Sequence, residues 1–297
     1  MHTVRLVHVD KEEGLVIPSS TVTVAALQMT SGADTHSNVE HAFALLEEAA
    51  GSGATYIQLP EYFNYYGPAS NYGEVAQPIA GPLTDRLCKF AKTHRVVLHV
   101  GSMLERVEGA TKFFNTSVVI STGGDILATY RKVHLFDIDV PGEVSYQESR
   151  AISAGQELVT VELDAFTLGM SICFDVRFPE LYRSLALRGA TVLGVPSAFN
   201  ARTGQAHWDV LVRARAIENL CFVVAATQAG TTAQGLSSYG HAMIVDPWGE
   251  VLATSHGDDE QVVVASIDLN EVSRRRAQIA TLALRRPDLY GLRVDNG

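Results

Sequence analysis

Short apolar runs rich in β-branched residues recur along the 297-residue chain and limit the folds open to it more than any other feature. Some of these runs are followed by segments with helical spacing of apolar residues, and others by glycine-containing turns and a further run. Alternation with helices in places and with hairpins elsewhere indicates an α/β protein whose sheets are mixed, not purely parallel.

The predicted elements run almost continuously through the chain. Helices are expected at residues 38–50, 83–94, 179–188, 207–219 and 269–279, with Asn38 and Thr84 as N-caps of the first two. Strands are expected at residues 21–29, 55–60, 96–102, 114–120, 126–131, 158–163, 166–172, 192–196, 222–227, 241–245, 251–253 and 262–267. Nothing between them has the composition of a linker, so we predict an N-terminal tail over residues 1–20 and one domain over residues 21–297.

Composition excludes several classes of protein. A net charge of −10 argues against nucleic acid as a partner. The apolar runs are too short to cross a membrane, and the N-terminus lacks the apolar region of a signal peptide. The three cysteines cannot all pair within the chain, which indicates a reducing, cytoplasmic location. The glycosylation sequon at residues 115–117 would have no use there.

Cys173 stands where an apolar strand ends and a helix begins at Pro179. This junction places a side chain at a sheet edge, facing a cleft, with free helix N–H groups nearby. A thiol there can act as a nucleophile, although a single cysteine after an apolar strand is more often a packing residue.

Two other apolar strands also end in reactive side chains, at Glu61 and at Lys132. If the three strand ends meet at one sheet edge, the site has the groups for acyl transfer. The carboxylate of Glu61 would take the thiol proton, and the ammonium group of Lys132 would stabilise the oxyanion. Spacing along the chain does not by itself establish that they meet.

These three segments, together with several others in the same order, resemble the nitrilase (carbon–nitrogen hydrolase) superfamily and its Glu-Lys-Cys triad. The similarity covers nearly all of residues 22–292. The other matching segments are residues 196–199, 203–208, 213–219, 239–241, 246–250 and 286–291. The chain looks most similar to the Nit branch, which contains ω-amidase and deaminated glutathione amidase. Asn200 is similar to the first of these, and residues 196–197 and 286–290 to the second.

The resemblance implies a four-layer α-β-β-α sandwich with two mixed sheets, and a role for each matched residue. Glu61 would be general base and acid, Lys132 the oxyanion stabiliser and Cys173 the nucleophile, with the backbone N–H of Phe174 as second oxyanion donor. Glu148 would orient Lys132 and the substrate nitrogen. Glu143, in the same loop, is a competing candidate whose surroundings match less well.

Further residues are candidates for binding substrate. Arg177 would either bind a substrate carboxylate or form an ion pair with Glu180 or Asp175. Arg202 is a weaker candidate for the same task. The other side chains predicted to line the pocket are Tyr62, Phe63, Phe199 and Asn200. The tyrosine-rich segment 62–82 has the length of a functional rim.

The implied function is hydrolysis of a terminal amide in a small acidic metabolite, either an α-keto-monoamide or deaminated glutathione, with release of ammonia. The alternatives are an N-carbamoyl amidohydrolase or nitrilase with the same triad, and a non-catalytic interaction protein. Family members associate through helical faces, so a homodimer or larger assembly is expected. The sequence contains no metal-binding or dinucleotide-binding pattern, and we expect neither metal nor cofactor.

Overall fold

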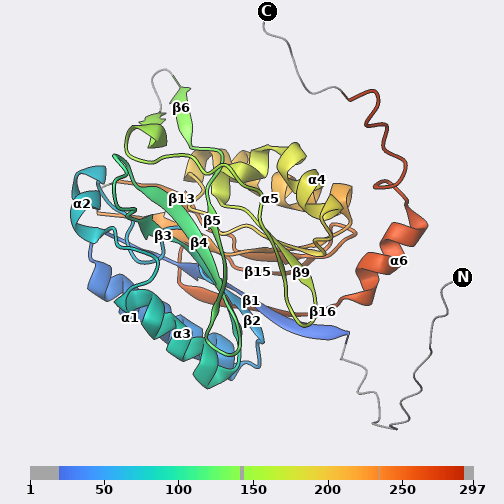
Figure 1. Cartoon of the computed structure of the whole chain (residues 1–297), viewed down its shortest axis with the longest axis horizontal. Coiled ribbons are helices and arrows are strands. Elements are labelled where there is room, and N and C mark those ends of the chain that lie inside the picture. The colour runs from blue at the N-terminus through green and yellow to red at the C-terminus, as the bar shows by residue number, and fades with distance from the viewer. Residues whose placement is uncertain (1–19, 141–143, 234, 291–297) are drawn as a thin grey trace, which may run out of the picture.

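The computed structural model describes residues 20–140, 144–233 and 235–290, and the predicted α/β class with mixed sheets is confirmed. Two sheets stack face to face, with helices on both outer sides (Figure 1). The first sheet contains β13 (Ser237–Tyr239), β12 (Thr227–Thr231), β1 (Thr21–Met29), β2 (Tyr56–Gln58), β3 (Val97–Glu105), β4 (Phe114–Ile120) and β5 (Ile126–Arg131), with β16 (Gln261–Asp268) also paired to β1.

The second sheet and the helices complete the four layers. Its strand order is β15 (Val251–Thr254), β14 (Met243–Val245), β11 (Phe222–Ala225), β10 (Val192–Gly194), β9 (Thr167–Met170) and β8 (Thr160–Glu162), and β6 (Asp137–Val140) and β7 (Val144–Gln147) form a separate hairpin. The helical elements are α1 (Thr35–Gly51), η1 (Ala69–Asn71), α2 (Tyr72–Val75), α3 (Pro82–His94), η2 (Glu148–Arg150), η3 (Cys173–Arg177), α4 (Pro179–Leu187), α5 (Ala201–Asn219) and α6 (Asn270–Gln278). Helices α1 and α3 pack on the first sheet, and α4 and α5 on the second (Figure 1).

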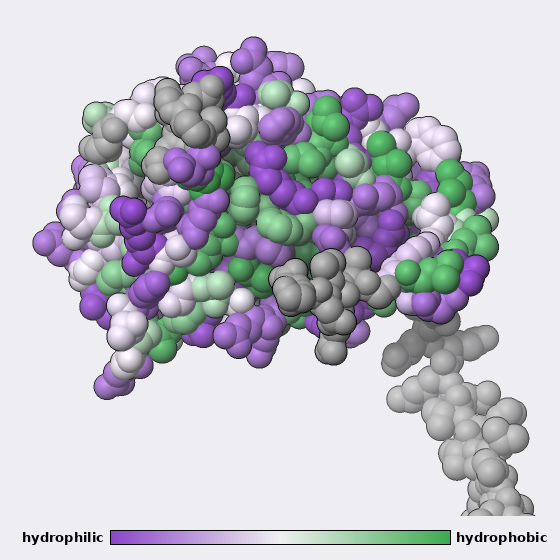
Figure 2. Space-filling view, turned by 90° about the horizontal axis from the view of Figure 1, so that it is seen from above, coloured by the Kyte–Doolittle hydropathy of each residue, from purple (hydrophilic) through white to green (hydrophobic). Residues whose placement is uncertain are grey.

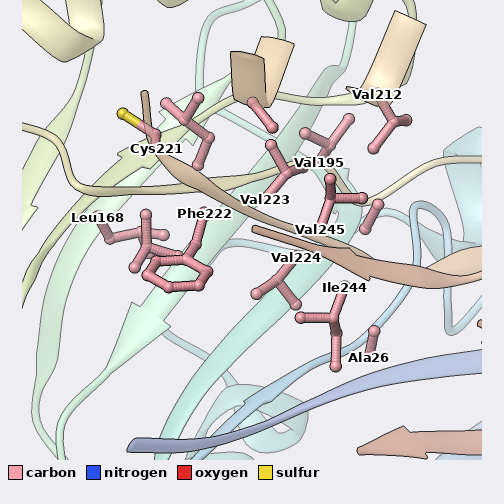
Figure 3. Packing of buried hydrophobic residues seen from close by; sticks show 14 of the residues in the cluster. Ala26, Leu168, Val195, Val212, Cys221, Phe222, Val223, Val224, Ile244 and Val245 are labelled. Carbon is pink, nitrogen blue, oxygen red and sulfur yellow. The ribbon is translucent and has the colours of Figure 1, made fainter. Parts of the chain in front are cut away.

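Side chains of β1 point alternately to the two faces of the first sheet and so pack in two different hydrophobic clusters. Val24 and Ala26 point into the cluster between the two sheets, whereas Ala25 and Leu27 pack in the cluster beneath α1 and α3. Successive side chains of a strand point to opposite faces, so an apolar strand can be buried on both sides. Figure 3 shows Ala26 beside Ile244 of the second sheet.

A polar contact also lies between the sheets, around the fully buried imidazole of His99. Its Nδ1 is 2.7 Å from the Tyr56 hydroxyl and 3.0 Å from Nε2 of Gln58, and its Nε2 is 2.8 Å from Oγ of Ser117. Gly194 of β10 leaves room for this cluster, because a Cβ there would lie 2.6 Å from Cε1 of His99. Burial without a counter-charge lowers the pKa of His99 to about 3.

Three helix starts differ from the prediction. Asp34, not Asn38, caps α1, and the Asn38 side chain is buried against the backbone of Gly32 and Asn64. Helix α3 begins after Gly81, without a side-chain cap from Thr84. Helix α5 begins at Ala201 rather than at residue 207, with the side chain of Asn200 accepting from backbone N–H groups of the first turn.

Two further differences lie in the loops. The segment predicted as a long loop after residue 131 contains the β6–β7 hairpin and η2. The nucleophile candidate, Cys173, is the first residue of one short helix, η3, and α4 then begins at Pro179 as predicted. The predicted tail, apart from Ser20, and Glu143 lie outside the described residues.

Candidate active site

Glu61 is held in the turn that follows β2. The backbone of Tyr62 has a φ of 57°, and its N–H donates to Oγ of Ser102 at 3.0 Å. Nε2 of Gln228 donates to the backbone carbonyl of Glu61 at 3.0 Å. Gly101 of β3 passes so close to this turn that a Cβ would collide with the carbonyl oxygens of Leu59 and Pro60. The turn is thus fixed from three sides, which sets the direction of the Glu61 side chain.

Lys132 directly follows β5, and its backbone is tied on both sides. Its N–H donates to the carbonyl of Asn115 on β4 at 2.9 Å, and its own carbonyl accepts from the N–H of Gly155 at 2.8 Å. The side chain is 2 % exposed. A buried ammonium group is stable only where opposite charges and acceptors surround it.

Cys173 is the first residue of η3 and has a φ of 47°. Its N–H donates to the carbonyl of Pro196 at 2.9 Å, which ties the turn to the strand end beside it. Left-handed backbone is uncommon for a residue with a side chain and is frequent at functional turns.

The buried carboxylate of Asp175 joins the Cys173 turn to the segment that carries Lys132. It accepts the backbone N–H of Ile172 at 2.9 Å and that of His134 at 3.0 Å. It also accepts the hydroxyl of Tyr130 at 2.7 Å, and Nδ1 of His134 lies 2.7 Å away. Four contacts on one carboxylate hold two segments distant in sequence in a fixed relation.

The side chains of Glu61, Lys132 and Glu148 form one buried ion cluster. Nζ of Lys132 lies 2.8 Å from Oε1 of Glu61 and 3.0 Å from Oε2 of Glu148. The other oxygen of Glu61 accepts the N–H of Ala198 at 2.7 Å. Glu148 also accepts the N–H of Phe136 at 2.7 Å and the hydroxyl of Tyr62 at 2.9 Å. The ammonium group is therefore shared between two fixed carboxylates.

Burial and these neighbours decide the protonation states. Burial raises the pKa of the Cys173 thiol well above its ordinary value, the facing Glu61 carboxylate raises it further, and the charge of Lys132 offsets only part. Burial acts to lower the pKa of Lys132, but the charges of Glu148 and Glu61 outweigh it, and the pKa lies well above its usual range. For Glu148, burial acts to raise the pKa, but Lys132 and the donated hydrogen bonds hold it below its ordinary value. The site thus pairs a protonated thiol with a charged amine.

A cavity of about 480 Å³ opens onto this cluster. Glu61, Lys132, Glu148 and Cys173 all line it, so the structure brings the four predicted catalytic candidates together. Of the predicted pocket residues, Tyr62, Phe174, Phe199 and Asn200 also line it. Side chains that the sequence did not single out are Tyr66, Tyr72, Phe136, Tyr146, Thr203 and Ser237. Tyrosines 62, 66 and 72 come from the segment predicted as a rim.

Phe63, predicted to line the pocket, does not line this cavity, and Arg177, for which substrate binding and an ion pair were both open, does not line it either. Phe63 is fully buried in the cluster beneath α1 and α3. The guanidinium of Arg177 lies over the ring of Phe199 at 5.0 Å, and its Nη1 is 3.3 Å from Nδ1 of His207. Arg177 therefore contacts the aromatic side chains of Phe174 and Phe199, which line the cavity, without lining it itself.

Within residues 20–140, 144–233 and 235–290, no group of three or more His, Cys, Asp and Glu side chains is arranged to hold a metal ion. In the same described ranges, no helix has the length and apolar character needed to traverse a bilayer. The charged chemistry available at this cavity is that of the ion cluster and the thiol.

The chain belongs to the carbon–nitrogen hydrolase family, whose sequence model matches residues 23–277. Human omega-amidase NIT2 is 40% identical over 271 residues, which cover 91% of this chain and 97% of that protein. Deaminated glutathione amidase from Synechocystis sp. (strain PCC 6803 / GT-S) is 43% identical over 261 residues, covering 87% of this chain and 96% of that one. The chain is therefore a carbon–nitrogen hydrolase, as the sequence predicted.

Two solved structures have the same fold. The C. elegans NitFhit protein superposes with a TM-score of 0.85 at 37% identity, covering 92% of this chain and 67% of that chain. A point mutant of an amidase from Nesterenkonia sp. AN1 superposes with a TM-score of 0.77 at 25% identity, covering 93% of this chain and 98% of that chain. That second structure shows the acetamide moiety of fluoroacetamide covalently added at the active-site cysteine.

Proposed function

We propose that this carbon–nitrogen hydrolase cleaves a terminal amide through a thioester on Cys173. The observation that carries the proposal is the meeting of one thiol, one ammonium group and two carboxylates at the floor of a single cavity. Covalent capture at the cysteine of the Nesterenkonia amidase supports Cys173 as the nucleophile. The omega-amidase and deaminated glutathione amidase relatives support an amide as substrate.

In the first half-reaction the Cys173 sulfur attacks the amide carbonyl carbon while Glu61 takes the thiol proton. A base is needed because the buried thiol is protonated at rest. The ammonium group of Lys132 and the backbone N–H of Phe174 stabilise the negative oxygen of the tetrahedral intermediate. When the carbon–nitrogen bond breaks, Glu61 gives its proton to the nitrogen, and ammonia leaves. Glu148 holds Lys132 and faces the departing nitrogen.

In the second half-reaction water replaces ammonia beside Glu61. The Glu61 carboxylate takes a proton from the water while the water oxygen attacks the thioester carbonyl. The same oxyanion donors, Lys132 and the N–H of Phe174, stabilise the second tetrahedral intermediate. The carbon–sulfur bond then breaks, the acid product leaves, and the sulfur regains the proton from Glu61. Each group returns to its starting state, so no external reactant besides water is required.

We further propose that the substrate is a small acidic metabolite, with α-keto-monoamides and deaminated glutathione as the two candidates. A cavity of about 480 Å³ is in the range that holds ligands of this size. The lining of this cavity also includes the hydroxyl-bearing side chains of Tyr66, Tyr72 and Ser237. Hydroxyl and amide groups can bind a substrate carboxylate without placing another cation beside Lys132.

The deciding experiment measures ammonia release from a panel of substrates by the wild type and by Cys173→Ala. The panel contains both candidate monoamides, the same monoamides with their carboxylates esterified, a nitrile and an N-carbamoyl amino acid. Selective turnover of acidic monoamides that is lost in Cys173→Ala is the expected result. Turnover of the nitrile or carbamoyl compound alone would replace the amidase proposal, and full turnover by Cys173→Ala would remove the nucleophile assignment.

We also propose that the protein forms a homodimer or larger homo-oligomer through the outer helical face of α4 and α5. The large apolar side chains of Leu187, Val210 and Ile217 on these helices are 47%, 66% and 47% exposed. Seen from the side on which α4 and α5 lie in Figure 1, the surface has apolar areas among polar ones (Figure 2). Light scattering of the wild type and of Val210→Glu tests this, with a smaller mass expected for the variant.

Two further assignments complete the proposal. The family match over residues 23–277 supports a single catalytic domain that begins at residue 21, after the N-terminal tail.

Cys88, Cys173 and Cys221 are all free thiols, which supports a reducing compartment and hence a cytoplasmic location. Fractionation of cells that express the full chain checks the compartment.

A further inference from the structure

Asn115 of β4 is a fully buried side chain that contacts both carboxylates of the ion cluster. Its Nδ2 donates to Oε1 of Glu61 at 2.8 Å and to Oε1 of Glu148 at 3.2 Å. Its backbone carbonyl accepts the N–H of Lys132 at 2.9 Å. One asparagine thus touches three members of the cluster, from a strand that carries none of them.

The direction of the Asn115 amide follows from its neighbours. Two N–H groups on one nitrogen match two carboxylate oxygens, whereas the reversed amide would place its oxygen against both negative charges. In the arrangement observed, Oδ1 of Asn115 has no hydrogen-bond partner among the residues that the structure describes. A buried amide oxygen without a partner costs free energy. The two hydrogen bonds that the Asn115 nitrogen donates outweigh this cost.

The charges of the cluster explain why these donors are needed. Two buried carboxylates share one ammonium group, so the group of three carries one unbalanced negative charge. Like charges at this distance favour protonation of one carboxylate. Two additional N–H donors, one to each acid, favour the ionised form of both without adding a charge.

We propose that Asn115 is a positioning residue, which holds Glu61 and Glu148 apart on the two sides of Lys132 through one donated hydrogen bond to each carboxylate. This inference rests on the proposed amide hydrolysis. Glu61 then remains free to accept the thiol proton, and Glu148 remains a fixed partner of Lys132. Asn115 acts through these two acids.

Other titratable groups face the same two acids and set the background for any pH effect. From the surrounding elements these groups are Lys132 after β5, Cys173 in η3, Tyr62 and Tyr66 after β2, Tyr72 of α2 and Tyr146 of β7. Lys132 and the tyrosines titrate far above neutral pH, so they do not set the acid side of an activity profile.

The test compares Asn115→Ala and Asn115→Asp with Thr116→Val. Thr116 is the next residue of β4, is equally buried, and donates to Oε2 of Glu105 on the opposite face. Thr116→Val therefore removes one buried hydrogen bond from the same strand without touching the site. Asn115→Ser retains one hydrogen-bond donor in a smaller side chain. This variant replaces Asn115→Ala and Asn115→Asp in the test if those two do not fold.

The expected result is a fall in kcat of roughly 10- to 100-fold at neutral pH for each Asn115 variant, with a smaller change in KM. The acid limb of the kcat/KM profile moves up by about one pH unit, so part of the loss is recovered at higher pH. Thr116→Val keeps the wild-type profile. An equal loss at every pH, or a wild-type profile in the Asn115 variants, would overturn the proposal.

Alkylation of Cys173 by iodoacetamide provides a second measurement that needs no substrate. Its pH dependence should move in the same direction in the Asn115 variants, because deprotonation of the thiol depends on an ionised base. If the wild type releases no ammonia from any amide, the proposed function fails. The alkylation profile then still decides whether Asn115 controls the acids, and an unmoved profile would overturn that role.

Discussion

The hydroxyl of Tyr130 donates to Oδ2 of Asp175 at 2.7 Å, and this bond joins the strand that leads to Lys132 with the turn that begins at Cys173. Both side chains are buried, at 1% and 0% exposure. A hydrogen bond from a neutral hydroxyl to a buried carboxylate is among the stronger ones in proteins. The distance between the nucleophile and the ammonium group therefore depends on a contact that neither of them makes.

Removing this hydroxyl should slow catalysis with little effect on substrate binding. Tyr130→Phe leaves a buried carboxylate one donor short, which should cost about 1.5–3 kcal/mol of stability. We expect kcat to fall by roughly tenfold or more, since misplacement of reacting groups is costly even when it is small. Steady-state kinetics and urea denaturation measure the two effects. If Tyr130→Phe is destabilised but keeps the wild-type kcat, the Tyr130 hydrogen bond contributes to stability and not to catalysis.

Loss of the ammonium group should affect both rate and stability. Lys132→Met leaves Glu61 and Glu148 as unpaired buried charges, which should destabilise the fold by about 3–5 kcal/mol. Loss of the main oxyanion donor should lower kcat by roughly 10²–10³-fold. In the double variant Lys132→Met/Glu148→Gln, stability should recover in part and activity should not. Recovery of activity would contradict the oxyanion role.

His99 predicts a dependence of stability on pH that is unrelated to the active site. Its ordinary pKa is 6.5 and its pKa in the fold is about 3, so between these values the unfolded chain binds one more proton than the folded chain. Stability should therefore fall as the pH falls from 6.5 towards 3, by about 1.4 kcal/mol per pH unit. Urea denaturation at about pH 7.5 and pH 5 of the wild type and His99→Gln measures this, with a smaller pH effect expected in the variant. Equal pH effects in both proteins would exclude His99 as the cause.

Gly101 should tolerate no side chain. In Gly101→Ala the added Cβ meets the carbonyl oxygens of Leu59 and Pro60, which are backbone atoms and cannot rotate away. We expect a loss of about 3 kcal/mol or more, with reduced activity because the Glu61 turn must move. Gly51→Ala, at the end of α1 with open space around the site of the Cβ, is the matched control and should be neutral or slightly stabilising. Thermal melts of both variants give the comparison.

The sequence predicted the strand ends well because each is marked locally. An apolar run that stops at Glu61, Lys132 or Cys173 is visible in the residues themselves, and the structure brings these three positions to one cavity. The resemblance to a known family supplied the step that local pattern could not, namely that residues 71 positions apart meet as Glu61 and Lys132 do.

The features that the sequence missed depend on contacts between distant segments. Gly204, before the predicted helix start at residue 207, lies inside α5, where a Cβ would collide with the side chain of Tyr239. The glycine serves packing there, and the helix begins earlier than predicted. In the same way, nothing local shows that Arg177 turns behind Phe199. For Asn115, the only feature visible in the sequence was the sequon at residues 115–117. A sequon indicates N-glycosylation and not a contact with buried carboxylates.

That sequon is incompatible with the buried position of Asn115 in the fold. The amide nitrogen to which an oligosaccharide would be attached is the same atom that bonds Glu61 and Glu148 inside the closed protein. A sugar added before folding would have no space there, and the two β-sheets could not close around it. A chain glycosylated at Asn115 could therefore not form the buried hydrogen bonds from this amide nitrogen to Glu61 and Glu148.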